Sequence, residues 1–134
     1  RFKADLRAIE QALGDLAVAY HGDVSNDARA RAIQLFQEDP KTRYFIGQPQ
    51  SGGIGLTLTA ADCAIYYSNS FDLETRLQSE DRCHRIGTKN NITYIDIEAP
   101  KTIDGKIIKA LRSKKSLADI ITKDPASLFL DEEK

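Results

Sequence analysis

The sequence predicts an α/β fold, in which parallel strands form one sheet between two layers of helices. Strand-like and helix-like patterns alternate along the chain, and its 134 residues are enough to bury a core without disulfides or metal. Strands that alternate with helices are joined by right-handed crossovers, which makes neighbouring strands parallel. Ligands of such sheets bind at the carboxyl ends of the strands, so the chemistry is expected at that edge.

The first two helices and the strand between them have clear local signals. A helix is expected over residues 3–13, because apolar side chains recur there at three- and four-residue intervals and Gly14 follows. Residues 16–20 form a short apolar run that predicts a buried strand. Ser25 is placed to cap a second helix, and Pro40 closes that unit.

Three further runs rich in β-branched and aromatic residues predict strands over residues 43–46, 64–67 and 92–97. Because the chain opens directly with a helix, we expect the strand that normally precedes such a helix to lie upstream of residue 1.

A long final helix is expected to start near Thr102. Its apolar side would consist of Ile103, Ile107, Leu111, Ala118 and Ile121. We expect one domain over residues 1–126 and a loose acidic end over residues 127–134.

Composition restricts the classes of function and location. The 19 basic and 20 acidic residues give a net charge of -1, so any attraction to nucleic-acid phosphate must be local. No apolar run approaches the roughly 20 residues that a membrane-spanning helix needs, and no signal-peptide core follows the N-terminus. Two cysteines are too few for a disulfide framework, and Cys63 is expected to be a buried thiol. We therefore expect a reducing, cytoplasmic location.

The strongest chemical signal is one helical face that combines an amide with two guanidinium groups. At about 100° per residue, Gln78, Arg82 and Arg85 fall within roughly 60° of one another. Leu73 and Leu77 point elsewhere and are expected to anchor the helix to the sheet. Two adjacent arginines repel each other unless an anion lies between them, and a triphosphate is such an anion.

The alternative for the arginines is an ordinary solvated face, with ion pairs to Glu74, Glu80 or Asp81. The glycines that precede this helix favour a ligand site, because they allow close backbone approach, although a glycine-rich loop can also be only a turn. A dinucleotide fingerprint fails because Leu58 stands where its third glycine is required, and no Walker A sequence is present.

Two segments resemble helicase motifs in the order of that family. Residues 51–62 look like helicase motif V, and residues 78–87 resemble the Snf2 form of motif VI. Residues 21–36 and 99–104 are similar to the flanking family segments, so the resemblance spans nearly the whole chain. The chain thus resembles the C-terminal RecA-like lobe of Snf2-type, DNA-dependent ATPases of helicase superfamily 2. Its compact spacing looks more like that of bacterial or phage members.

This resemblance implies an ATP site shared between two lobes. Walker A and the acidic Mg²⁺ motif would lie on a first lobe of the same parent chain, which would hold most of the ATP and Mg²⁺. Arg82 and Arg85 would be an arginine-finger pair, and Gln78 would support the nucleotide face. The backbone beside ATP would be that of Gly52, Gly53 and Gly55.

The resemblance also implies sequence-independent binding to the DNA backbone. Ser51 and Thr57 are candidates for phosphate contacts, with a purely structural role equally open, whereas Thr59 is expected to cap the short segment that follows it. No metal site is expected. His84 has only Cys83 beside it, so a packing role is favoured.

The leading hypothesis is therefore one lobe of an ATP-driven DNA translocase or helicase, inactive in isolation. The alternative is a nucleic-acid-binding or partner-docking module without turnover. A Rossmann-like metabolic enzyme is disfavoured by the failed fingerprint.

Overall fold

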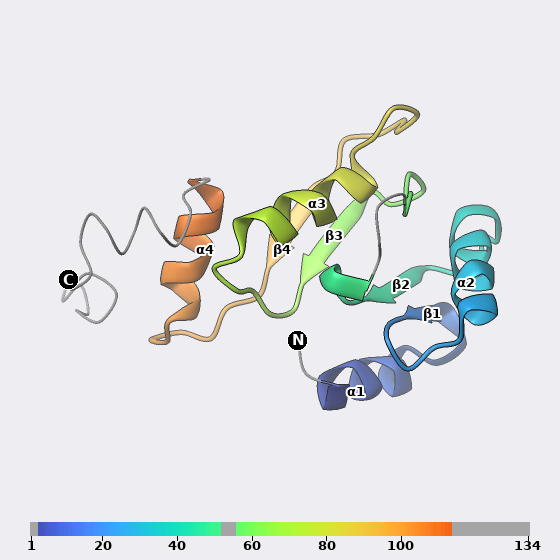
Figure 1. The fold of residues 1–134 in the computed structure, drawn as a ribbon, viewed down its shortest axis with the longest axis horizontal. Coiled ribbons are helices and arrows are strands. Elements are labelled where there is room, and N and C mark those ends of the chain that lie inside the picture. The colour runs from blue at the N-terminus through green and yellow to red at the C-terminus, as the bar shows by residue number, and fades with distance from the viewer. Residues whose placement is uncertain (1–2, 52–55, 114–134) are drawn as a thin grey trace.

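The alternation of helices and strands predicted from the sequence is present. The computed structural model describes residues 3–51 and 56–113 (Figure 1). In chain order the elements are α1 (Lys3–Leu13), η1 (Gly14–Leu16), β1 (Ala17–Tyr20), α2 (Asn26–Glu38), β2 (Tyr44–Gly47), η2 (Pro49–Ser51), β3 (Cys63–Tyr66), α3 (Leu73–Cys83), β4 (Thr93–Asp96) and α4 (Asp104–Arg112).

The two local signals at the start of the chain act as expected. Gly14 follows the last residue of α1 and adopts a φ of +54°, which ends the helix at low steric cost. Ser25 has an extended backbone, and its hydroxyl accepts a hydrogen bond from the Ala28 amide at 3.3 Å, so it caps α2. Leu16 was expected in the strand but lies in η1, so β1 begins one residue later.

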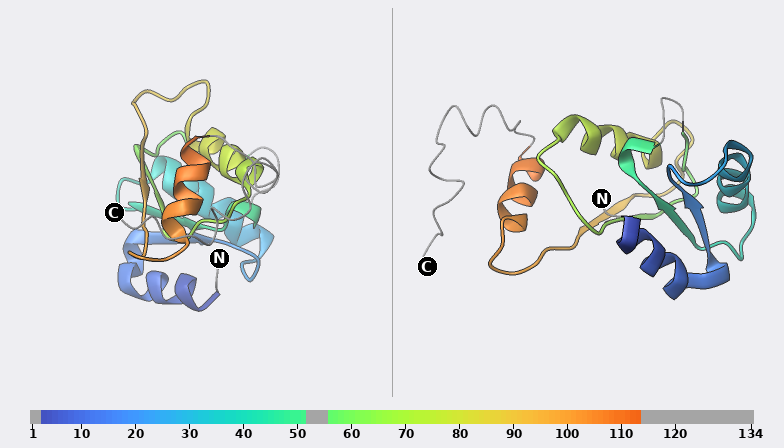
Figure 2. Two further views of the ribbon diagram at one scale, coloured as in Figure 1. Left: turned by 90° about the vertical axis from the view of Figure 1, so that its left-hand side faces the viewer. Right: turned by 60° about the horizontal axis from the view of Figure 1, so that its bottom comes forward.

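The strands are parallel, but they form two pairs and not one sheet. β1 pairs with β2 and β3 pairs with β4, and no ladder joins β2 to β3 within the described residues. α1 and α2 lie on opposite sides of the first pair, while α3 and α4 lie with the second pair (Figures 1 and 2). The predicted α/β class and strand direction are therefore confirmed, whereas the expected continuous ladder is absent from this part of the chain.

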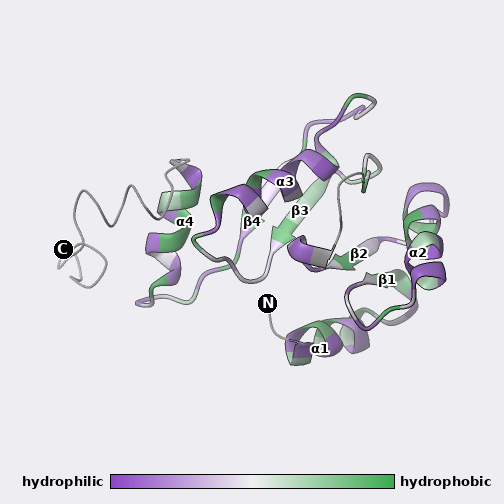
Figure 3. Ribbon diagram, viewed as in Figure 1, coloured by the Kyte–Doolittle hydropathy of each residue, from purple (hydrophilic) through white to green (hydrophobic). Residues whose placement is uncertain are grey.

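The second strand pair is covered unevenly. α3 packs on the face that carries Tyr66 and Asp96, and the direct cross-strand partners Ile65 and Ile95 on the opposite face are exposed. Figure 3 shows an apolar β3 beneath a largely hydrophilic α3. Polar contacts must therefore contribute much of the attachment of α3 to the sheet.

The core includes two leucines of the segment that resembles motif V. Leu56, Leu58 and Cys83 form its buried centre, and aromatic rings from β1, α2 and β2 pack around it. Cys63 is exposed, so the prediction that it is a buried thiol is wrong, and Cys83 is the buried one. Cys63 lies on the uncovered face of the β3–β4 pair, together with Ile65.

The final described helix, α4, begins at Asp104, two residues after the expected start. Ile107, Ile108 and Leu111 are buried along it, while Ile103 is about half exposed. The predicted continuation through Ala118 and Ile121, the boundary at residue 126 and the acidic end lie outside the described residues. Among the helices of the described segments, none has the length and apolar character required to cross a membrane.

Candidate functional site

The α3 helix delivers the first arginine but stops before the second. Asp72 caps its start by accepting a hydrogen bond from the Thr75 amide at 3.0 Å, and the helix ends at Cys83. The prediction that Gln78, Arg82 and Arg85 share one helical face is thus wrong for Arg85. The Thr88 hydroxyl accepts from the Arg85 amide at 2.9 Å, a local bond that competes with continuation of the helix.

Both arginine side chains nevertheless contact the chain next to the glycines: one contacts a residue before residues 52–55, and the other contacts a residue after them. Arg82 Nη2 donates to the Pro49 carbonyl oxygen at 2.7 Å, and Arg85 Nη1 donates to the Thr57 hydroxyl at 3.0 Å. The Leu58 amide donates to the Arg82 carbonyl at 2.8 Å, which fixes the backbones of the two segments against each other. The predicted proximity of the arginines to this segment is confirmed.

Two of the three carboxylates named in the alternative interpretation, Glu74 and Glu80, have partners other than the two arginines. Glu80 accepts from Arg76 at 2.7 Å, and Glu74 accepts from the Gln78 amide at 3.2 Å. Partial burial lowers the pKa of Arg82 below its usual range, yet a guanidinium keeps its charge at neutral pH. Gln78 is exposed on α3, one turn before Arg82.

A residue that sequence reasoning missed, Gln37, holds the segment that resembles motif V. Its side-chain amide donates to the Thr57 carbonyl at 3.3 Å and to the Thr59 hydroxyl at 3.2 Å, and its oxygen accepts from the Ala60 amide at 2.8 Å. Gln37 therefore caps the turn at residues 59–60. The prediction that Thr59 would cap it is wrong. A glutamine near the end of an amphipathic helix carries no sequence signal for such a contact.

The remaining predicted site residues lie at the edge of the described region. Ser51 is the last residue of η2, whereas Gly52, Gly53 and Gly55 lie outside the described residues. Thr57 is the second residue after Gly55, and its hydroxyl is the oxygen that Arg85 contacts.

A buried ionic cluster fixes α3 on β4. The Arg76 side chain is 8% exposed and donates to Asp96 at 2.6 Å, and its guanidinium lies 3.5 Å from the centroid of the Tyr66 ring. Asn69 and Arg112 also donate to Asp96, at 3.0 and 3.3 Å. Leu77 is exposed, so the prediction that the two leucines anchor α3 fails at this position.

Two pKa values in this cluster shift in opposite directions, for different physical reasons. Burial alone would raise the pKa of Asp96, but the hydrogen bond and positive charge of Arg76 outweigh it and lower the pKa below 3.8. Burial raises the pKa of Tyr66 to about 12, against the smaller effect of a hydrogen bond with Ser79.

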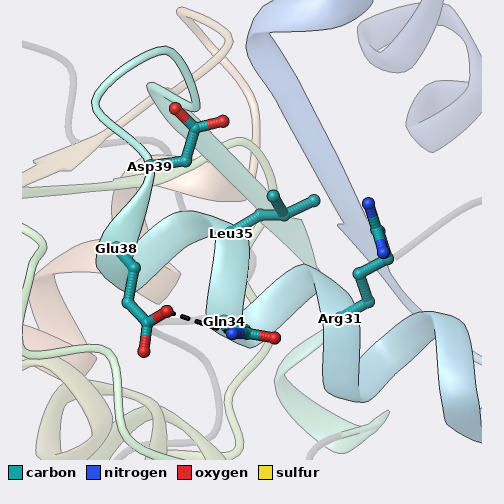
Figure 4. A pocket seen from close by; sticks show the side chains of 5 residues that line it. All are labelled: Arg31, Gln34, Leu35, Glu38 and Asp39. Carbon is teal, nitrogen blue, oxygen red and sulfur yellow. Dashed lines mark hydrogen bonds between the residues drawn. The ribbon is translucent and has the colours of Figure 1, made fainter.

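Two surface hollows in the described segments lie apart from the two arginines, and one of them, of about 240 Å³, is lined by Arg76, Asp96 and Arg112 among others. The other, of about 270 Å³ on α2, contains no predicted site residue (Figure 4). It is lined by Arg31, Gln34, Leu35, Glu38 and Asp39. Within residues 3–51 and 56–113, no group of three potential metal ligands occurs, and His84 is exposed, contrary to the packing role favoured for it.

The fold and the site define a RecA-like α/β lobe that presents two arginines beside a glycine-containing segment. Residues 2–87 match the family model described as helicase conserved C-terminal domain. The chain therefore belongs to the helicase C-terminal domain family, and its homologues are Snf2-type helicases.

The similar proteins are long helicases. The chain is 34% identical over 100 residues to the human lymphoid-specific helicase, a match that covers 75% of this chain and 12% of that protein. It is also 34% identical to Helicase SWR1 of Candida glabrata, which covers 81% of this chain and 7% of that protein. The crystal structure of the C-terminal part of the Fun30 ATPase domain aligns with a TM-score of 0.73 and 27% identity, over 87% of this chain and 39% of that one. These relatives are eukaryotic, so the comparison gives the expected bacterial or phage origin no support.

Proposed function

We propose that this lobe completes the ATP site of a DNA translocase, with Arg82 and Arg85 acting as an arginine-finger pair. The observation that carries the proposal is that both side chains extend from the end of α3 to the segment around the glycines, at Pro49 and Thr57. ATP and Mg²⁺ would be held mainly by a first lobe of the parent protein. An arginine finger contributes roughly 10³- to 10⁵-fold in rate to nucleoside triphosphate hydrolysis.

The remaining candidate residues would surround this centre. Gln78 would support the nucleotide face, and the backbone that lies beside ATP would be that of Gly52, Gly53 and Gly55. Ser51 and Thr57 would contact DNA phosphates without reading bases, which predicts strongly salt-dependent binding.

The bond between Arg85 and Thr57 supports a link between hydrolysis and DNA binding. It joins a proposed finger to a proposed phosphate contact at 3.0 Å. A change in the position of Arg85 after hydrolysis would therefore act directly on the DNA-facing segment, and repeated closure and opening of the two lobes would move the protein along DNA.

The test compares Arg85→Ala with Arg31→Ala in the full-length protein. Arg31 is an exposed arginine of α2 that has no contact with the arginine site, so it controls for the general loss of positive charge. We expect Arg85→Ala to abolish DNA-stimulated ATP hydrolysis while leaving DNA affinity unchanged, and Arg31→Ala to preserve both. Retained turnover in Arg85→Ala would refute the finger assignment, and absence of turnover in the unaltered full-length protein would favour a docking or binding module.

A further inference from the structure

The most exposed apolar side chain among the described residues lies directly beside a proposed finger. Ile86 is 102% exposed, and it follows Arg85 in the chain. Single exposed apolar residues are common on protein surfaces and need no special account by themselves. Ile86 differs from them because the backbone that carries it is fixed at both ends.

Ile86 occupies the tip of a closed four-residue turn. The Thr88 amide donates to the Arg85 carbonyl at 2.9 Å, and the Arg85 amide donates back to the Thr88 hydroxyl at 2.9 Å. The same hydroxyl lies within hydrogen-bond distance of the carbonyls of Cys83 and Arg85, at 3.0 and 2.7 Å. Gly87 adopts a φ of +104°, the positive value that a type II turn requires at its third position and that glycine tolerates best.

The base of the turn is fixed to the core and to the arginine site. Cys83 is buried beside Leu56 and Leu58, and the Arg85 side chain reaches Thr57. The turn is therefore preorganised, and a β-branched isoleucine has few χ1 states to lose. An apolar group held in this way binds a partner at a low cost in conformational entropy.

We infer that Ile86 is the apolar anchor by which this lobe docks on the first lobe when the two close around ATP. The inference rests on the proposed function. If Arg85 reaches a nucleotide held by the first lobe, the Cα atom of Ile86 lies only about 3.8 Å from that of Arg85, so the closing first lobe comes within reach of this exposed side chain. The partner surface would be an apolar depression beside the nucleotide, and burial of the isoleucine would favour the closed state by roughly 10- to 100-fold.

The experiment measures lobe closure in the full-length protein by fluorescence energy transfer between labels on the two lobes, with DNA and a non-hydrolysable ATP analogue. We expect Ile86→Ser to lose most of the closed population and to raise KM for ATP by about tenfold. Ile86→Val should retain both, because it keeps a branched apolar side chain. Ile103→Ser, at a half-exposed isoleucine before α4, is the matched control and should close normally.

Two readouts separate docking on the first lobe from a direct DNA contact and from a loss of stability. DNA affinity without nucleotide and the thermal unfolding temperature should be unchanged in Ile86→Ser, because the side chain makes little contact within this lobe. Normal closure in Ile86→Ser would overturn the inference, and so would a loss of nucleotide-free DNA binding, which would place the side chain on DNA. If Arg85→Ala abolishes hydrolysis while Ile86→Ser closes normally, only the anchor is wrong. If Arg85→Ala retains hydrolysis, the proposed function itself fails.

Discussion

Replacement of Arg76 by leucine should destabilise the lobe more than any change to the proposed fingers. The side chains of Arg76 and Asp96 are 8% and 3% exposed, so their 2.6 Å ion pair is shielded from water. Removal of one partner of a buried pair costs about 3 to 5 kcal/mol, because the other charge stays buried. Loss of the contact with the Tyr66 ring adds about 0.5 to 2 kcal/mol.

Two remaining donors reduce this cost. Asn69 and Arg112 still contact Asp96 in the variant, so we expect a net loss of about 3 kcal/mol in the free energy of unfolding. Domains of this kind are commonly stable by only about 5 to 15 kcal/mol, so the variant would remain folded with a small margin.

Equilibrium urea unfolding followed by circular dichroism measures the loss. Arg112→Leu is the control, because its side chain is 65% exposed and its pair with Asp96 is worth no more than about 1 kcal/mol. The double variant Arg76→Leu/Asp96→Leu should recover part of the lost stability, since it also removes the buried Asp96 charge that has lost its main partner. A loss below about 1 kcal/mol in the single variant, or a larger loss in the double variant, would refute this account of the cluster.

Two other predictions concern pH and thiol chemistry. Because the pKa of Asp96 is lowered in the folded state, its contribution to stability is present above the ordinary value of 3.8 and is lost as the pH falls below it. Thermal unfolding between pH 7 and 3 should show this loss, and an equally steep acid dependence in Asp96→Asn would contradict it. Cys63 should react rapidly with a maleimide, because it is exposed, whereas burial restricts access to Cys83 and raises the pKa of the Cys83 thiol. Mass spectrometry should therefore find one modified thiol under native conditions and two in urea.

Local signals in the sequence predicted the elements of this fold well. Helical spacing followed by Gly14 predicted the bounds of α1, and Ser25 predicted the start of α2, because both effects act within a few residues. The short apolar runs located every strand to within one or two residues. The same signals could not show how the strands pair, since pairing depends on segments distant in the sequence.

The position of the two arginines beside the glycine-containing segment was predicted, but the backbone that presents Arg85 was not. Arg82 and Arg85 face the expected segment, yet Arg85 does so from a turn that depends on Thr88 and not from a continuous helix. Gln37 and Arg76 were missed because a polar residue on an amphipathic helix is normally assigned to solvent. Only the tertiary structure reveals that Gln37 binds the segment at Thr57 and that Arg76 is buried against the sheet.

The division of the strands into two pairs has a consequence for the behaviour of this lobe in solution. Within the described residues, β2 and β3 each have a neighbour on one side only, and their other edges present backbone amides and carbonyls that lack a ladder partner. Tyr44–Gly47 and Cys63–Tyr66 contain neither a charged residue nor a proline, the residue types with which natural edge strands resist intermolecular pairing. Concentrated samples of the lobe by itself are therefore expected to self-associate through these two edges, and a charged substitution at the exposed Tyr44 or Ile65 would be the direct means of keeping it monomeric.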